Sequence, residues 1–384
     1  PIQARYKKMT FDEVIGQEEA KQQLQLLIKE NRVPHALLLT GPSGVGKLAL
    51  AVAFACKLLS MPVNGKQPSP NTRVMLQNLE HPDLIFSYPV IKPKGWKKDK
   101  SPVSDDFAKQ WHDLIMQGPY FSLAQWMEQI KVEKQQSLFT EKESDELTHK
   151  LSLKSSQGGY KVVVMWLPER MNTVCANKIL KLLEEPPHQT VFLMACDHPE
   201  NLLKTILSRT QRIEIKGIAD SDIQDALVNK CGIDQNAAER IARMAHGSWQ
   251  KALNAISGNN EEKEFLELFI SFMRYAYQAR LKELKDWTEQ VCTFGREKER
   301  RLLLYFPRLL RENFMYNFHQ PELIYMTEAE EAFAKNFARF INEANIIPSS
   351  EVIESCYKDI GSNGNERIIL FDMAIKITQL IRLK

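Results

Sequence analysis

Hydrophobic residues follow two different patterns along the chain, and the change comes near residue 216. Before it, short continuous apolar runs alternate with segments in which apolar residues recur every three or four positions. Continuous runs are typical of buried strands in a parallel sheet, and the spaced pattern is typical of helices. We therefore expect a doubly wound α/β domain, with predicted strands at 36–40, 83–88, 160–167, 190–197 and a last one ending near Ile215.

Beyond residue 216 the continuous runs stop, and the helical spacing continues. Three short helices are predicted between residues 221 and 256, and a polar linker follows at 258–260. The later predicted helices are 302–314, 333–341 and 368–383. We predict three domains, 1–217, 218–260 and 261–384, of which the last two are entirely helical. Residues 64–72 are expected to form a loop, and a polar, largely helical insertion is expected at about 91–158.

One stretch carries recognisable chemistry, because a predicted strand runs into a glycine-rich turn and then into a helix. A turn of this kind directs several backbone N–H groups at one phosphate, and the helix dipole favours the anion. The residues expected to hold a nucleotide phosphate are Gly41, Gly44, Val45, Gly46 and Lys47. The alternative is an ordinary strand-to-helix turn with a surface lysine.

The turn departs from an active phosphate loop at Leu48, where a serine or threonine hydroxyl should bind Mg²⁺. A leucine has no oxygen to offer the metal. We therefore predict a degenerate phosphate loop that holds no metal and requires no cofactor. The sequence leaves open whether the loop still binds ATP or ADP.

Composition narrows the class of protein only slightly. The 384 residues carry a net charge of +3, and 26% of them are charged, as in ordinary globular proteins. The six cysteines form no CxxC pair, which gives no sign of zinc or of a redox centre. No apolar segment is long enough to be a signal peptide or to span a membrane, so we expect a cytoplasmic protein with no membrane partner.

Six stretches agree, in order, with one known family: VIGQEEA (14–20), HALLLTGPSGVGK (35–47), HPDL (81–84), YKVVV with ANKILKLLEEPP (160–187), TILSRTQRIEI (205–215) and GSWQKAL (247–253). On these stretches the chain resembles the clamp-loader branch of the AAA+ proteins, and within it the delta-prime family of bacterial DNA polymerase III. The resemblance implies an AAA+ phosphate-loop domain, a small helical lid at 218–260 and a helical oligomerisation collar at 261–384. The last third agrees only in being helical.

The departures from the family pattern concern ATP hydrolysis. Active members end the third predicted strand in an acidic pair, whereas this chain has Trp166 and Leu167, with Glu169 further along. The lid arginine that senses phosphate is replaced by Gln250. Because phosphoryl transfer depends on positioning and charge neutralisation, the resemblance implies that the chain's own ATPase is lost. Residues 64–79 contain none of the zinc-binding cysteines of many relatives, so no zinc module is expected.

One part of the machinery is kept. The family's SRC motif places an arginine in the ATP site of a neighbouring subunit, and the matching residue is Arg209, within Ser208-Arg209-Thr210. Position alone fits equally well with an arginine that caps the preceding helix. The resemblance implies a non-hydrolysing subunit that assembles with delta and gamma/tau type subunits and donates Arg209 in trans. The complex would load a sliding clamp onto primer–template DNA at the replisome.

Two alternatives belong to other classes of protein. The chain could be an active ATPase whose unusual metal site uses Glu169 or Asp197, and isolated protein would then turn over ATP. It could instead be a stand-alone DNA-binding module that uses the basic segments 91–100 and 152–161. The second alternative predicts DNA binding that depends steeply on salt, although a basic loop is more often only solvated.

Overall fold

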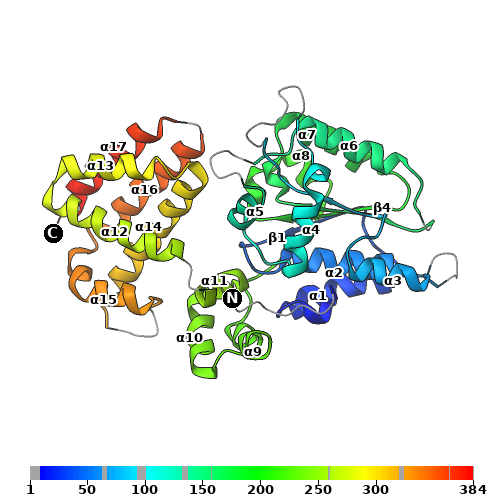
Figure 1. The fold of residues 1–384 in the computed structure, drawn as a ribbon, viewed down its shortest axis with the longest axis horizontal. Helices are drawn as coiled ribbons and strands as arrows, with labels where there is room; N and C mark the ends of the chain where they lie inside the picture. Colours follow the sequence, from blue (N-terminus) through cyan, green and yellow to red (C-terminus); the bar gives the residue numbers. More distant parts are fainter. Residues whose placement is uncertain are drawn as a thin grey trace. The chain divides into compact units, whose positions relative to one another are not determined.

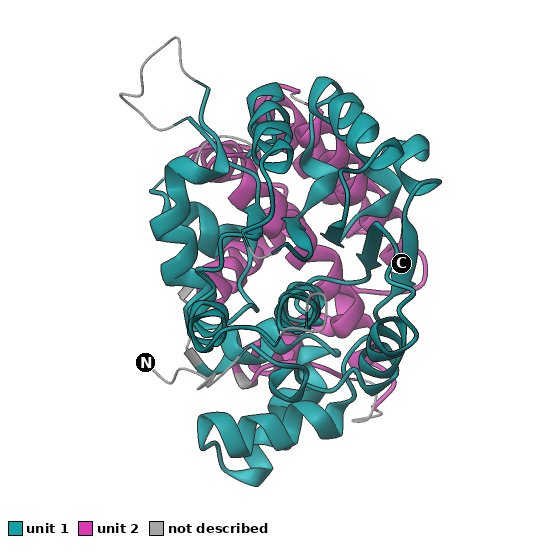
Figure 2. Ribbon diagram, turned by 90° about the vertical axis from the view of Figure 1, so that its right-hand side faces the viewer, with its two compact units in different colours: residues 1–132, 137–257 teal, residues 133–136, 258–384 magenta. Residues whose placement is uncertain are grey.

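The fold is described from a computed structural model, for residues 9–62, 67–92, 101–131, 137–156, 158–257, 260–319, 324–362 and 364–383. Contacts divide the chain into two compact units (Figure 2). The first unit comprises residues 1–132 and 137–257, and the second comprises 133–136 and 258–384. Within the first unit the structure does not separate the predicted lid, so the three-domain division stays a prediction.

The first unit is built on one five-stranded sheet in which every pairing is parallel and the order is β2-β3-β4-β1-β5. The α/β class expected from the apolar runs is therefore confirmed. The strands are β1 (Ala36–Thr40), β2 (Leu84–Ser87), β3 (Lys161–Trp166), β4 (Thr190–Cys196) and β5 (Gln211–Glu214).

Helices cover both faces of this sheet, because alternate side chains of each buried strand point to opposite faces. In β1, Leu37 and Leu39 belong to the core beneath α2, and Leu38 belongs to the core beneath α7. Figure 1 shows α1, α2 and α3 on one side and α6 and α7 on the other. The helices are α1 (Glu18–Lys29), α2 (Lys47–Leu59), α3 (Pro70–Gln77), α6 (Glu141–Ser152), α7 (Thr173–Glu184) and α8 (Lys204–Leu207).

The expected loop at 64–72 is wrong at its end, because α3 begins at Pro70. Ser69 caps this helix by accepting the N–H of Thr72 at 3.3 Å, and proline suits the first helical position. The polar composition of this stretch favoured a loop, whereas its last residues begin a short helix that the Ser69 cap stabilises. Residues 63–66 lie outside the described part of the chain.

The predicted insertion is largely helical, as expected, and it packs on the sheet through an aromatic cluster. Tyr88, which follows β2, stacks on Trp111 with 4.0 Å between ring centroids, and Trp126 meets Tyr88 edge-on at 5.0 Å. Such pairs stabilise a core beyond their buried area. The helical segments are η2 (Ser104–Phe107), α4 (Ala108–Gln117), α5 (Leu123–Gln129) and α6.

Three helices complete the first unit after the sheet: α9 (Asp220–Cys231), α10 (Gln235–Ala245) and α11 (Trp249–Ser257). Short 3₁₀ turns join other elements at η1 (Phe11–Glu13), η3 (Pro168–Arg170) and η4 (Pro199–Asn201). The fully buried indole of Trp249 ties the start of α11 into the core of the sheet.

The described residues of the second unit form helices joined by short connections and contain no strand, which confirms the expected all-α C-terminal region. Its core gathers Phe269, Phe306 and Trp287. Of the helices whose residues are described, none is long and apolar enough to cross a membrane. The elements are α12 (Asn260–Gln278), α13 (Leu281–Val291), α14 (Arg296–Tyr316), α15 (Glu328–Phe337), η6 (Ala338–Phe340), α16 (Ile346–Gly361) and α17 (Glu366–Leu380).

Candidate nucleotide site

The phosphate loop lies at the carboxyl ends of the parallel strands, where ligands of such sheets bind. Thr40 at the end of β1 is in register with Cys196 of β4, and α2 begins directly after the loop. Gly44 and Gly46 have φ angles of +81° and +99°, which L-residues with side chains rarely adopt. The glycines predicted from the motif therefore have a backbone reason for being glycine.

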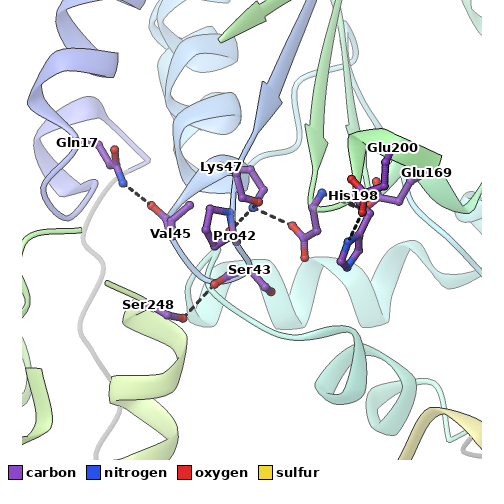
Figure 3. A network of polar contacts seen from close by, with 11 residues as sticks. Gln17, Pro42, Ser43, Val45, Lys47, Glu169, His198, Glu200 and Ser248 are labelled. Carbon is purple, nitrogen blue, oxygen red and sulfur yellow. Dashed lines mark hydrogen bonds and ion pairs between the residues drawn. The ribbon is translucent and has the colours of Figure 1, made fainter. Parts of the chain in front are cut away.

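Lys47 is not available to a phosphate in this structure, because protein oxygens already surround its ammonium. It donates to the carbonyls of Gly41, at 2.7 Å, and Pro42, and it forms an ion pair with Asp197 at 2.8 Å (Figure 3). The Lys47 side chain is only 5% exposed. A nucleotide phosphate would have to displace the Asp197 carboxylate, which repels it, before reaching this lysine.

The loop is also held from two other sides. Ser248, just before α11, donates its hydroxyl to the carbonyl of Ser43 at 3.0 Å (Figure 3). A Cβ atom at Gly44 would lie 2.1 Å from the same hydroxyl. From the segment before α1, the Gln17 amide donates to the carbonyl of Val45 at 3.0 Å. The residues expected to cradle a phosphate are therefore brought together, but they make contacts within the chain.

Apolar side chains fill the positions where hydrolysis needs oxygen ligands. Leu48, Trp166 and Leu167 are each between 5% and 6% exposed. Trp166 packs against Trp111 and Phe121 at ring-centroid distances of 5.5 and 5.1 Å. A carboxylate in this aromatic setting would lose its hydration without gaining a partner, so the site is built for an apolar side chain here.

Glu169 and Asp197, the residues of the alternative metal site, have other partners. Glu169 accepts the N–H groups of Asp197 at 2.8 Å and His198 at 3.2 Å, which fixes the turn after β4. Its second oxygen is buried without a hydrogen-bond partner among the described residues. Burial, and then the nearby Asp197 charge, raise the pKa of Glu169.

The lid position also lacks a positive charge. Gln250 matches the position of the sensing arginine in the family pattern, and it is only 7% exposed. It lies against the loop, because a Cβ atom added at Gly44 would be 2.8 Å from the Cβ atom of Gln250. A neutral amide beside the loop does not neutralise phosphate charge.

Arg209 lies at the surface, just after α8. Its side chain is 37% exposed and forms an ion pair with Glu184 of α7 at 2.7 Å. It also donates to the carbonyl of Thr205 at 3.1 Å, which is the helix-capping contact expected from position alone. The capping contact and an exposed guanidinium are compatible, so the trans role stays a prediction.

One group of side chains in the described residues has a geometry that could hold a metal, and it lies in the second unit. Ligand atoms of Cys292, Glu299 and Glu366 lie within 4.8 Å of one another. Arg296 donates to Glu366 at 2.6 Å and supplies a positive charge there already. The phosphate loop is not part of such a group.

The basic segments of the DNA-binding alternative receive no support. Residues 93–100 lie outside the described part of the chain. Lys161 is only 6% exposed, and its ammonium donates to the carbonyls of Lys150, at 3.0 Å, and Leu153 at the end of α6. This lysine is a buried helix cap and does not reach a phosphate backbone.

Sequence reasoning missed the side chains that close the phosphate loop. Asp197 was considered only as a metal ligand, and neither Ser248 nor Gln17 was singled out. A usable signal was available for Asp197, because it is the last residue of a predicted strand whose carboxyl end must lie beside the loop.

Comparisons with known proteins agree with the motifs. The model of the family described as "DNA polymerase III, delta subunit" matches residues 16–219. The DNA polymerase III subunit delta' of Bacillus subtilis is 22% identical over 275 residues, covering 71% of this chain and 68% of that protein. The subunit delta' of Yersinia pestis is 48% identical over 66 residues, covering 17% of this chain and 19% of that protein.

One larger relative also matches. The DNA polymerase III subunit tau/gamma of Haemophilus influenzae is 26% identical over 255 residues, which cover 65% of this chain and 31% of that protein. The chain therefore spans about a third of the length of this relative.

Proposed function

Because this chain belongs to the DNA polymerase III delta subunit family, as its motifs predicted, we propose that it is a non-hydrolysing clamp-loader subunit. It assembles with delta and gamma/tau type subunits into a ring. The ring loads a sliding clamp onto primer–template DNA during replication, in the cytoplasm. Within the ring, residues 261–384 form this subunit's part of the collar.

The observation that carries the non-hydrolysing role is the ion pair between Lys47 and Asp197 inside a closed phosphate loop. Catalysis of phosphoryl transfer depends on cations that neutralise the charge on the phosphate oxygens. Here the loop lysine is already neutralised, and the place of the Mg²⁺ ligand is taken by buried Leu48. A phosphate loop whose lysine is paired within the chain, and which lacks the Mg²⁺ ligand, supports a structural role for this subunit and not ATP hydrolysis.

We further propose that this chain donates Arg209 to the ATP site of a neighbouring subunit, and the partly exposed side chain of Arg209 supports this role. An arginine fork is permanently charged and matches phosphate oxygens in two places at once. Its ion pair with Glu184 is at the surface, where such pairs contribute at most about 1 kcal/mol, so a neighbour's γ-phosphate can replace it. Arginine fingers supplied in trans accelerate GTP hydrolysis by roughly 10³- to 10⁵-fold.

The test is ATP turnover by the reconstituted assembly, with clamp and primed DNA, comparing the natural chain with Arg209→Ala. Arg243→Ala is the matched control, because Arg243 is also an exposed arginine in an ion pair, with Glu239 at 2.7 Å. A third variant, Glu184→Ala, removes the partner of Arg209 and leaves the guanidinium in place.

We expect this chain alone to show no ATP turnover. Arg209→Ala should slow ATP turnover by the assembly at least tenfold, whereas Arg243→Ala and Glu184→Ala should leave it near the rate of the natural chain. Turnover by the isolated chain would refute the non-hydrolysing role. An assembly that is indifferent to Arg209→Ala would refute the trans role, and Arg209 would then be only the cap of α8.

A further inference from the structure

The connection between α4 and α5 reaches into the phosphate loop, although it belongs to the predicted insertion. Tyr120 of this connection accepts the backbone N–H of Ile15 on its hydroxyl at 3.0 Å. A Cβ atom at Gly46 would lie 3.1 Å from the same hydroxyl and 3.2 Å from the ring. One phenol ring therefore contacts both the segment before α1 and the glycine turn that should hold a phosphate.

This contact is a buried one. Tyr120 is only 6% exposed, and burial raises the pKa of its hydroxyl, so the phenol stays neutral and keeps its hydrogen bonds. A backbone N–H buried as Ile15 is must find an acceptor, and the phenol supplies it. The hydrogen bond joins residues 105 positions apart, so it holds together parts of the chain that no local element would hold.

Phe121, the next residue, contacts the end of β3, where Trp166 and Leu167 stand in place of the acidic pair. Phe121 packs on Trp166 at the end of β3, with 5.1 Å between ring centroids. Trp111 of α4 meets the same indole at 5.5 Å. The apolar end of β3 and the connection between α4 and α5 therefore form one packed unit beside the phosphate loop.

We propose that the connection between α4 and α5 is a built-in ligand of the phosphate loop, and that Tyr120 takes space which an adenine nucleotide would need. This inference rests on the proposed function, since it explains how the inert site is kept closed. A ligand tethered within the chain competes permanently with free nucleotide. The apparent affinity then equals the intrinsic affinity multiplied by the fraction of molecules in which the site is open. This connection thus acts as a plug.

The test is titration of the full chain with a fluorescent ADP analogue. Asp197→Asn is the background, because it frees Lys47 from its ion pair. Asp197→Asn is combined with Tyr120→Ala, which removes the phenol ring from the loop, or with Tyr160→Ala as a control. Tyr160 is a half-buried tyrosine of the same core, and it directly precedes β3, at the amino ends of the strands and away from the phosphate loop.

We expect Asp197→Asn with Tyr120→Ala to bind the analogue at least tenfold more tightly than Asp197→Asn alone, and Tyr160→Ala to give no gain. Adding Lys47→Met should abolish the gained binding, which locates it at the phosphate loop. Equal affinity with and without Tyr120→Ala, or a gain that survives Lys47→Met, would overturn the inference.

A second measurement covers the case in which Tyr120→Ala does not fold. Tyr120→Phe keeps the ring and removes only the hydroxyl, so hydrogen exchange of the Ile15 amide should accelerate at least tenfold. Unchanged exchange would overturn the inference. The proposed function has its own test, because Arg209→Ala is read out as ATP turnover by the assembly. If Arg209→Ala slows ATP turnover by the assembly, but Tyr120→Ala does not tighten binding of the ADP analogue, the plug is refuted and the proposed function is not.

Discussion

Glu299 in α14 offers the sharpest test of the electrostatics, because its carboxyl group is fully buried beside the carboxylate of Glu366. The residue is fully buried, and neither of its oxygens has a hydrogen-bond partner among the described residues. Burial, and then the charge of Glu366, raise the pKa of Glu299 to about 8. At neutral pH the folded protein therefore holds a proton that the unfolded chain has released.

The pH dependence follows from this shift. Between the ordinary pKa of 4.5 and the folded pKa of about 8, only the folded state binds the proton, so stability falls as the pH rises. Each pH unit costs about 1.4 kcal/mol, and the whole interval sets a ceiling of about 5 kcal/mol. Because buried sites behave as if their dielectric were about 20, we expect roughly half of that ceiling to be realised.

Glu299→Gln replaces the protonated carboxyl group by a neutral amide of the same shape. We expect its free energy of unfolding to equal that of the natural chain at pH 5, and to exceed it by roughly 2 kcal/mol at pH 8.5. Urea unfolding at the two pH values measures the difference. Glu289→Gln, at an exposed position of α13 in the same unit, is the control and should show no pH-dependent gain.

Parallel pH profiles for the natural chain and Glu299→Gln would refute the reasoning. Repeating the series with a chelator separates a proton from a metal ion at the group formed by Cys292, Glu299 and Glu366. Stability that drops on chelation in the natural chain alone would show that a metal, and not a proton, neutralises Glu299.

Three further variants test contacts of the first unit. Glu143→Ala leaves the Ser104 N–H and the Ser87 hydroxyl, which donate to its carboxylate at 2.7 and 2.6 Å, without this acceptor, and should lower the free energy of unfolding by about 3 kcal/mol in urea titrations. Gly44→Ala places a Cβ atom 2.1 Å from the Ser248 hydroxyl, so limited proteolysis should cut near the start of α11 several times faster. Asp83→Ala removes the acceptor of a backbone N–H after α6 at 3.0 Å and should cost about 2 kcal/mol by the same titration.

Two of these variants have a control in the same unit. Glu146→Ala changes a half-buried glutamate of α6 and should cost far less than Glu143→Ala. Gly232→Ala is strained at φ +68° but meets no atom within 4 Å, so it should leave proteolysis near α11 unchanged. If Asp83→Ala unfolds at the same urea concentration as the natural chain, the Asp83 carboxylate contributes nothing to stability, and other contacts hold the segment after α6.

The sequence by itself determined the architecture of the first unit, because local patterns specify it. The apolar run of β1 is buried at every position, as a central parallel strand requires. The glycines of the loop were predicted from spacing, and Leu48 already excluded a Mg²⁺ hydroxyl. The family was also readable, since short motifs carry it and the match to residues 16–219 confirms it.

Only the tertiary structure decided what occupies the candidate site. The partner of Lys47 is Asp197, and the acceptor of the Ile15 N–H is Tyr120, which lies 105 residues away. Neither pairing leaves a periodic signal, because it depends on how the end of one strand and the connection between two helices pack beside the loop. A motif specifies which groups could bind a phosphate, whereas packing between distant segments decides whether those groups are free.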